Sequence, residues 1–178
     1  MPAPSEEVLP FGFSRGWPDA LPGCVITIRE TGILLGELLL DDKEWRALRS
    51  TPVLALRVDA HPGLDGWTSK HPDGTESRVE FEIPLVPVVV PLEALAHSRA
   101  FSQWVMNRHG GLGRLLIWDE PRRWWMVQDT DLELVITCSP PGMLAEKSKE
   151  LSWLSFGAEK GRKEVDLLRE RYGVTWAN

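Results

Sequence analysis

The stretch that decides the fold is residues 113–138, which read GRLLIWDEPRRWWMVQDTDLELVITC. Two turn signals separate three short runs that are rich in Leu, Ile, Val and Trp. In residues 119–121 a proline presets the backbone angle φ for a turn, and in residues 129–131 short acidic side chains bond their own backbone. The last run has period two, with apolar residues at 132, 134, 136 and 138 on one face. We therefore predict a three-stranded antiparallel meander.

Working outward from the meander, the spacing of apolar residues predicts further strands at residues 24–30, 33–40, 53–60 and 77–84. Asp41 and Glu44 match the capping-box pattern and predict a short helix over residues 42–49. Further helices are expected at residues 99–109 (with Ser98 as N-cap), 143–156 and 159–172. Residues 61–76 are rich in Gly, Pro and Asp, so we expect a hairpin between the third and fourth predicted strands with a long, mobile tip there.

These elements place the chain in the α+β class, as a mainly antiparallel β-sheet with helices packed on one face and a helical C-terminus. The length of 178 residues suits a single domain, residues 1–178. Within it, residues 1–22 form an irregular N-terminal lead-in that Phe11, Phe13 and Trp17 can pin to the body, and residues 142–178 form the C-terminal helices.

Charge and hydropathy limit the classes of partner. The net charge of −6, with no block of Lys and Arg, disfavours nucleic acid and favours a basic protein partner. The longest apolar run, residues 85–92, is too short to span a membrane, and the N-terminus lacks the pattern of a signal peptide. We therefore expect a cytoplasmic protein with no membrane partner, and the sequence leaves its oligomeric state open.

The sequence shows no recognisable cofactor or metal motif. Cys24 and Cys138 stand in separate predicted strands, outside any C-x-x-C spacing, and are expected to be free thiols; a disulfide between them requires neighbouring strands. The loop of residues 61–76 carries two His and two Asp residues, but their spacing matches no metal motif. We predict no cofactor and no metal site.

Nine tryptophans are the unusual feature of the composition. Trp124 and Trp125 are consecutive in a predicted strand, so they point to opposite faces. Either a helix of this chain or a partner must cover the second face, and Trp and Arg are enriched in binding hot spots. The candidate binding residues are Arg122, Arg123, Trp124, Trp125, Trp67, His61 and His71.

These observations favour a non-enzymatic, cytoplasmic protein-binding module of the adaptor, inhibitor or toxin-neutralising (immunity) kind, and no catalytic residues are assigned. One alternative is an enzyme acting on a small molecule, with His61, His71 or His109 as the acid or base. The other is a structural subunit of a larger assembly, which would use the apolar residues 84–91 or Trp176 as its contact.

Overall fold

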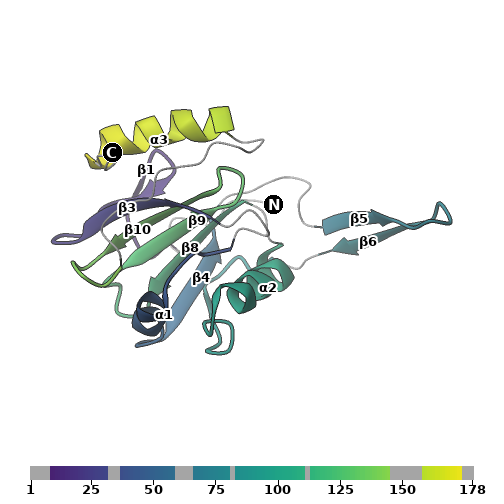
Figure 1. The fold of residues 1–178 in the computed structure, drawn as a ribbon, viewed down its shortest axis with the longest axis horizontal. Helices are drawn as coiled ribbons and strands as arrows, with labels where there is room; N and C mark the ends of the chain where they lie inside the picture. Colours follow the sequence, from purple (N-terminus) through teal and green to yellow (C-terminus); the bar gives the residue numbers. More distant parts are fainter. Residues whose placement is uncertain are drawn as a thin grey trace.

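A computed structural model describes residues 9–31, 37–58, 66–80, 83–110, 113–144 and 158–173. Its centre is a six-stranded antiparallel sheet with the strand order β3-β10-β9-β8-β4-β7 (Figure 1). The strands of this main sheet are β3 Val25–Glu30, β4 Val53–Arg57, β7 Val88–Val89, β8 Arg114–Asp119, β9 Trp125–Asp129 and β10 Leu134–Ser139. The α+β class and the mainly antiparallel sheet are therefore confirmed.

The predicted meander is confirmed, because β8, β9 and β10 are consecutive in the chain and adjacent in the sheet. Asp119 shapes the first turn: its Oδ1 accepts hydrogen bonds from the backbone N–H groups of Arg123 (2.6 Å) and Trp124 (3.3 Å). Asp129 shapes the second turn, where its Oδ1 accepts from the backbone of Asp131 (3.1 Å) and Leu132 (3.0 Å). The second turn thus uses a short acidic side chain as predicted, whereas the first turn, which the sequence signalled by its proline, is also held by the Asp119 carboxylate.

Strands from the first third of the chain complete the main sheet. The predicted strand at residues 24–30 forms β3 and pairs with β10, and the one at residues 53–60 forms β4 and pairs with β8. Half of the predicted strand at residues 33–40, namely residues 33–36, lies outside the described residues, and in the described half Leu38 forms an isolated bridge with Thr31.

Helices lie on both faces of the main sheet, whereas the sequence predicted them on one (Figure 1). The helices α1 Asp42–Leu48 and α2 Ser98–His109 bury apolar side chains such as Trp45 and Phe101 in a core on one face. The helix α3 Ala158–Tyr172 buries Val165 and Leu168 in a second core on the other face. Two cores form because the central strands are apolar on both sides, as Ile117 and Trp118 show.

The helix boundaries are set by local hydrogen bonds. The capping box of α1 is confirmed: Glu44 N donates to Asp41 Oδ1 (2.8 Å), and Asp41 N donates to Glu44 Oε2 (2.9 Å). The predicted N-cap Ser98 is instead the first residue of α2, since the Nδ1 of His97 accepts the hydrogen bond from Ala100 N at 3.2 Å. The predicted helix at residues 143–156 lies outside the described residues except for its first two positions, which form a turn.

The N-terminal segment is fastened to α3. It contains a small ribbon of β1 Phe13–Ser14 and β2 Trp17–Pro18, and the side chain of Trp17 is fully buried. Trp17 Nε1 donates to Glu164 Oε1 (2.7 Å), and Tyr172 Oη donates to Pro18 O (2.6 Å). Together, this segment and α3 close the second face of the main sheet.

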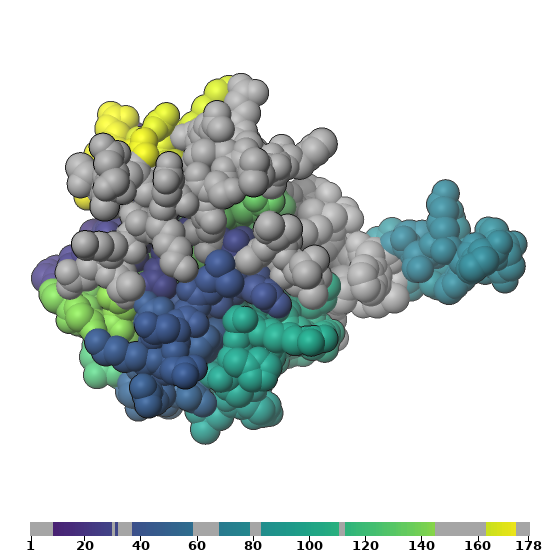
Figure 2. Space-filling view, in the orientation of Figure 1, coloured from purple at the N-terminus to yellow at the C-terminus, as the bar shows by residue number. Residues whose placement is uncertain are grey.

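A third, two-stranded sheet projects from the body as an arm (Figures 1 and 2). The arm consists of β5 Gly66–Lys70 and β6 Glu76–Glu80, which pair with each other. The predicted hairpin between residues 53–60 and 77–84 is therefore wrong, because β4 pairs with β7 and β8 and leaves no free edge for β6. Residues 66–70, which looked like loop in the sequence, supply the partner strand.

Within the part of the chain that the structure describes, no helix is long and apolar enough to cross a membrane.

Candidate binding surfaces

Four of the predicted binding residues lie in the β8–β9 turn and the first position of β9, where two are buried and two are exposed. Trp124 and Trp125 are 1% and 0% exposed, Trp124 in the core under α1 and α2 and Trp125 in the core under α3. The Nε1 of Trp125 donates to Asp19 O (3.0 Å), and its ring lies 6.4 Å from that of Tyr172. Both tryptophans are thus covered by this chain rather than by a partner. This is one of the two alternatives that the sequence left open.

The two arginines of the same turn are exposed. Arg123 Nε donates to the buried carboxylate of Asp119 at 2.7 Å, and its Nη2 lies 3.4 Å from Thr51 Oγ1. Arg123 is therefore held in the turn, while Arg122 adopts a left-handed backbone with φ of 60° at its tip.

The arm carries the remaining candidates that the structure describes. His71 is exposed at the start of the tip, where its Nε2 lies 2.9 Å from Ser77 Oγ. Asp73 Oδ1 accepts hydrogen bonds from Thr75 N (2.9 Å) and Thr75 Oγ1 (2.6 Å), and these bonds hold the pKa of Asp73 below its usual value. Trp67 pairs opposite Val79 in the arm, and His61 lies outside the described residues.

The structure does not bring the two groups of candidates together. The β8–β9 turn lies at the start of β4, since Asp119 pairs with Val53. The arm follows the other end of β4 and projects beyond the body (Figure 1). The predicted residues therefore do not form one surface.

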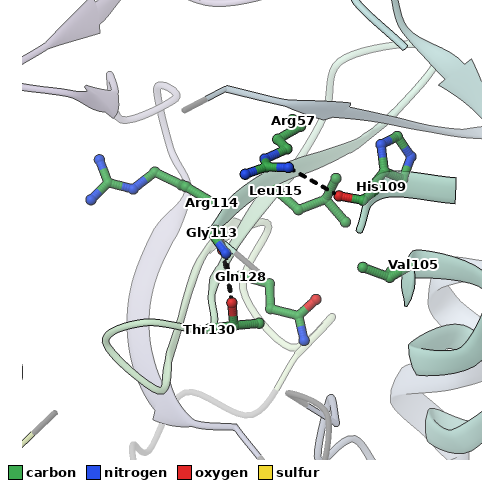
Figure 3. A pocket seen from close by; sticks show the side chains of 8 residues that line it. All are labelled: Arg57, Val105, His109, Gly113, Arg114, Leu115, Gln128 and Thr130. Atoms are coloured by element: carbon green, nitrogen blue, oxygen red, sulfur yellow. Dashed lines mark hydrogen bonds between the residues drawn. The ribbon is translucent and has the colours of Figure 1, made fainter. Parts of the chain in front are cut away.

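A small hollow lies at the C-terminal end of α2 (Figure 3). Its cavity volume is about 10 Å³, roughly the space of one water molecule and far below the range of about 300–1,000 Å³ that is usual for ligand pockets. Arg57 Nη1 donates to His109 O across one side (3.3 Å), and Gly113 N donates to Thr130 Oγ1 across another (2.7 Å). These two contacts engage part of the polar lining of the hollow in hydrogen bonds within the chain.

His109, the catalytic candidate of the enzyme alternative, is 1% exposed and packs edge-on against Trp104 with 5.1 Å between ring centroids. Burial, followed by the charges of Arg108 and Arg57, lowers the pKa of His109 to about 4. A buried imidazole with this pKa is a weak base at neutral pH. The ring therefore fits a packing role at the end of α2.

The two thiols are free; Cys138 lies in β10, and Cys24 directly precedes β3, the strand that pairs with β10. Cys138 is buried and accepts a hydrogen bond from Leu21 N at 3.3 Å, while Cys24 is half-buried. Burial, with a smaller contribution from Cys24, raises the pKa of Cys138 to about 11. Among the residues that the structure describes, no three His, Cys, Asp or Glu side chains are grouped so that they could hold a metal ion.

The segment between the arm and α2 exposes apolar side chains. Their exposed fractions are 44% for Leu85, 59% for Val86, 61% for Val89 and 65% for Leu92. We call these four residues the edge patch, because they lie in and beside β7, the outer strand of the main sheet. The sequence alone indicates residues 84–91 as a contact for a larger assembly, since the apolar pattern does not show which side chains are buried.

The backbone of this edge is closed to strand addition. Val90 N donates to Val53 O at 2.8 Å, and Val89 pairs opposite Leu54. In an antiparallel ladder the bonded positions alternate, so residues 87, 89 and 91 direct their backbone groups away from β4. Pro87 and Pro91 have no N–H, which leaves Val89 as the single outward donor of these three positions.

No family model, curated protein or solved structure matches this chain.

Proposed function

We propose that the protein is a non-enzymatic module that binds another protein through the edge patch. The observation that supports this most directly is the exposure of Leu85, Val86, Val89 and Leu92 within eight successive residues. Clustered apolar side chains at a protein surface are typical of interaction sites, whereas scattered ones are ordinary.

The partner contacts the edge patch through side chains. Strand addition needs a row of outward N–H groups, and Pro87 and Pro91 remove two of the three at this edge. The exposed side chains of Val86 and Val89 are then the anchors, and burying each apolar side chain contributes about 1.5–3 kcal/mol.

The partner's complementary surface is apolar at its centre and basic around it. The chain carries a net charge of −6, and the exposed Glu93 follows the edge patch directly. Opposite charges around an apolar contact speed association and exclude acidic competitors. Adaptor, inhibitor and toxin-neutralising proteins all work by such contacts, and a subunit of a larger assembly would use the same surface permanently.

The test is to capture partners with three forms of the protein and identify them by mass spectrometry. The forms are the wild type, the double variant Val86→Asp/Val89→Asp and the control Arg122→Asp at the exposed β8–β9 turn. A protein retained by the wild type and the control but lost by the double variant supports the proposal, provided that both variants melt as the wild type does. Loss with Arg122→Asp and retention by the double variant would move the binding surface to the turn.

A further inference from the structure

The arm is a second exposed feature of the molecule. It differs from the edge of the main sheet in the outward hydrogen-bonding groups of its backbone. All residues from Thr68 to Arg78 are exposed, and β5 and β6 pair only with each other within the described part of the chain. An isolated two-stranded ribbon is marginally stable in water, and further strands stabilise it. We propose that two copies of this protein associate by pairing β5 of one arm with β5 of the other, independently of the edge patch.

The hydrogen bonding at the tip of the arm determines which backbone groups of β5 point away from β6. His71 N donates to Thr75 O at 2.8 Å, so the alternation along the ladder directs the backbone groups of Gly66, Thr68 and Lys70 outward. None of the three is proline, and each therefore presents both an N–H donor and a C=O acceptor. This edge lacks the proline protection that closes β7.

A two-fold axis at Thr68 satisfies every one of these groups. It places Thr68 opposite Thr68 of the second copy and Gly66 opposite Lys70 of the second copy, so six backbone hydrogen bonds form. Cross-strand threonine pairs are favourable in sheets, and no like charges meet at this edge. The arm projects from its body (Figure 2). Because the paired strands would be antiparallel, the two bodies of the proposed dimer lie at opposite ends of a four-stranded arm.

The other edge of the arm is less suited to self-pairing. A two-fold axis on β6 centred at Arg78 brings two arginines opposite each other and places Glu76 opposite Glu80 of the second copy. Like charges directly opposite are unfavourable. Pairing β5 of one copy with β6 of another would leave free edges and build an open chain of molecules rather than a closed dimer.

Cysteine cross-linking of the full chain tests the register. In a hydrogen-bonded antiparallel pair the facing Cα atoms lie about 5.5 Å apart, within disulfide range. Thr68→Cys is expected to form a covalent dimer on treatment with diamide. Lys70→Cys is the matched control, because the two copies of residue 70 would lie about four residues apart along the strands. A dimer from Arg78→Cys but not from Thr68→Cys would overturn the proposal, and wild-type protein controls for Cys24 and Cys138.

Sedimentation of the reduced proteins tests the association itself. Wild type and Thr68→Val, which keeps the N–H, are expected to sediment as dimers. Thr68→Pro removes the Thr68 N–H, which points away from β6 and so is not needed for pairing within the arm. This change should weaken dimerisation about tenfold or more. A wild type that remains monomeric at high concentration, or a Thr68→Pro variant that associates as tightly as the wild type, would contradict β5 pairing. The edge-patch variants should leave this dimer intact, so failure of one proposal is distinguishable from failure of the other.

Discussion

Trp124 and Trp125 are neighbours in the chain, yet their rings lie in two separate cores on opposite faces of the main sheet. Trp124 packs in the core that α1 and α2 cover, and Trp125 packs in the core that α3 covers. Two consecutive residues after the β8–β9 turn therefore contribute large side chains to both cores.

Replacing either tryptophan should destabilise the protein. Trp124→Ala and Trp125→Ala are each expected to lower the free energy of unfolding by about 3–5 kcal/mol, because each leaves a large cavity in a packed core. Chemical denaturation measures this, with the exposed Arg122→Ala as a control that should change little. A tryptophan variant with unchanged stability would mean that its ring is not buried by this chain.

Glu44 has two roles whose loss should also be visible in stability. Its carboxylate forms a bidentate pair with the Arg29 guanidinium of β3, and it completes the capping box of α1. Both side chains are nearly buried, at 11% and 5% exposure for Arg29 and Glu44. Glu44→Ala should cost about 3–5 kcal/mol, because it leaves the buried Arg29 charge without its carboxylate.

Asp42 is the matched control for Glu44, since it is an exposed acid in the first turn of the same helix. Asp42→Ala should change stability by about 0.5 kcal/mol or less. The double variant Arg29→Met/Glu44→Leu should recover much of the loss, because apolar residues of similar volume replace a buried ion pair well. Equal effects of Glu44→Ala and Asp42→Ala would show that the buried pair contributes nothing.

His109 makes stability depend on pH. Its pKa is about 4 in the folded protein and about 6.5 in an unfolded chain. The unfolded chain therefore binds more protons between these values, so stability is full above about pH 6.5 and falls as the pH drops toward 4. From about pH 7 to pH 5 the wild type should lose about 2 kcal/mol more than His109→Gln, as measured by urea unfolding of both. Parallel losses would show that this histidine is not buried in its neutral form.

Local signals in the sequence were enough to predict the meander and the start of α1. Asp119, Asp129 and the pair Asp41 and Glu44 act on backbone groups within five residues of themselves. Turns and caps of this kind are local, so residue types and spacing indicate them without knowledge of the rest of the fold.

Features that depend on distant pairing were not predictable in this way. The arm strand β5 reads as loop because Thr68, Ser69 and Lys70 lack an apolar period, and only its pairing with β6 makes it a strand. Whether Pro87 and Pro91 remove outward N–H groups depends on the register of β7 against β4, and these two strands are more than thirty residues apart in the chain. The burial of Trp125 likewise depends on α3 from the end of the chain.

The most direct test of the proposed function is the affinity of an identified partner for two variants of one residue, measured by calorimetry. Val89→Asp places a charge in the edge patch and should weaken binding by about 2 kcal/mol or more, roughly 30-fold. Val89→Pro keeps an apolar side chain but removes the last outward N–H of β7, and should bind within a few-fold of the wild type. Unchanged affinity of Val89→Asp would contradict binding through the edge patch, and loss of binding in Val89→Pro alone would contradict recognition by side chains.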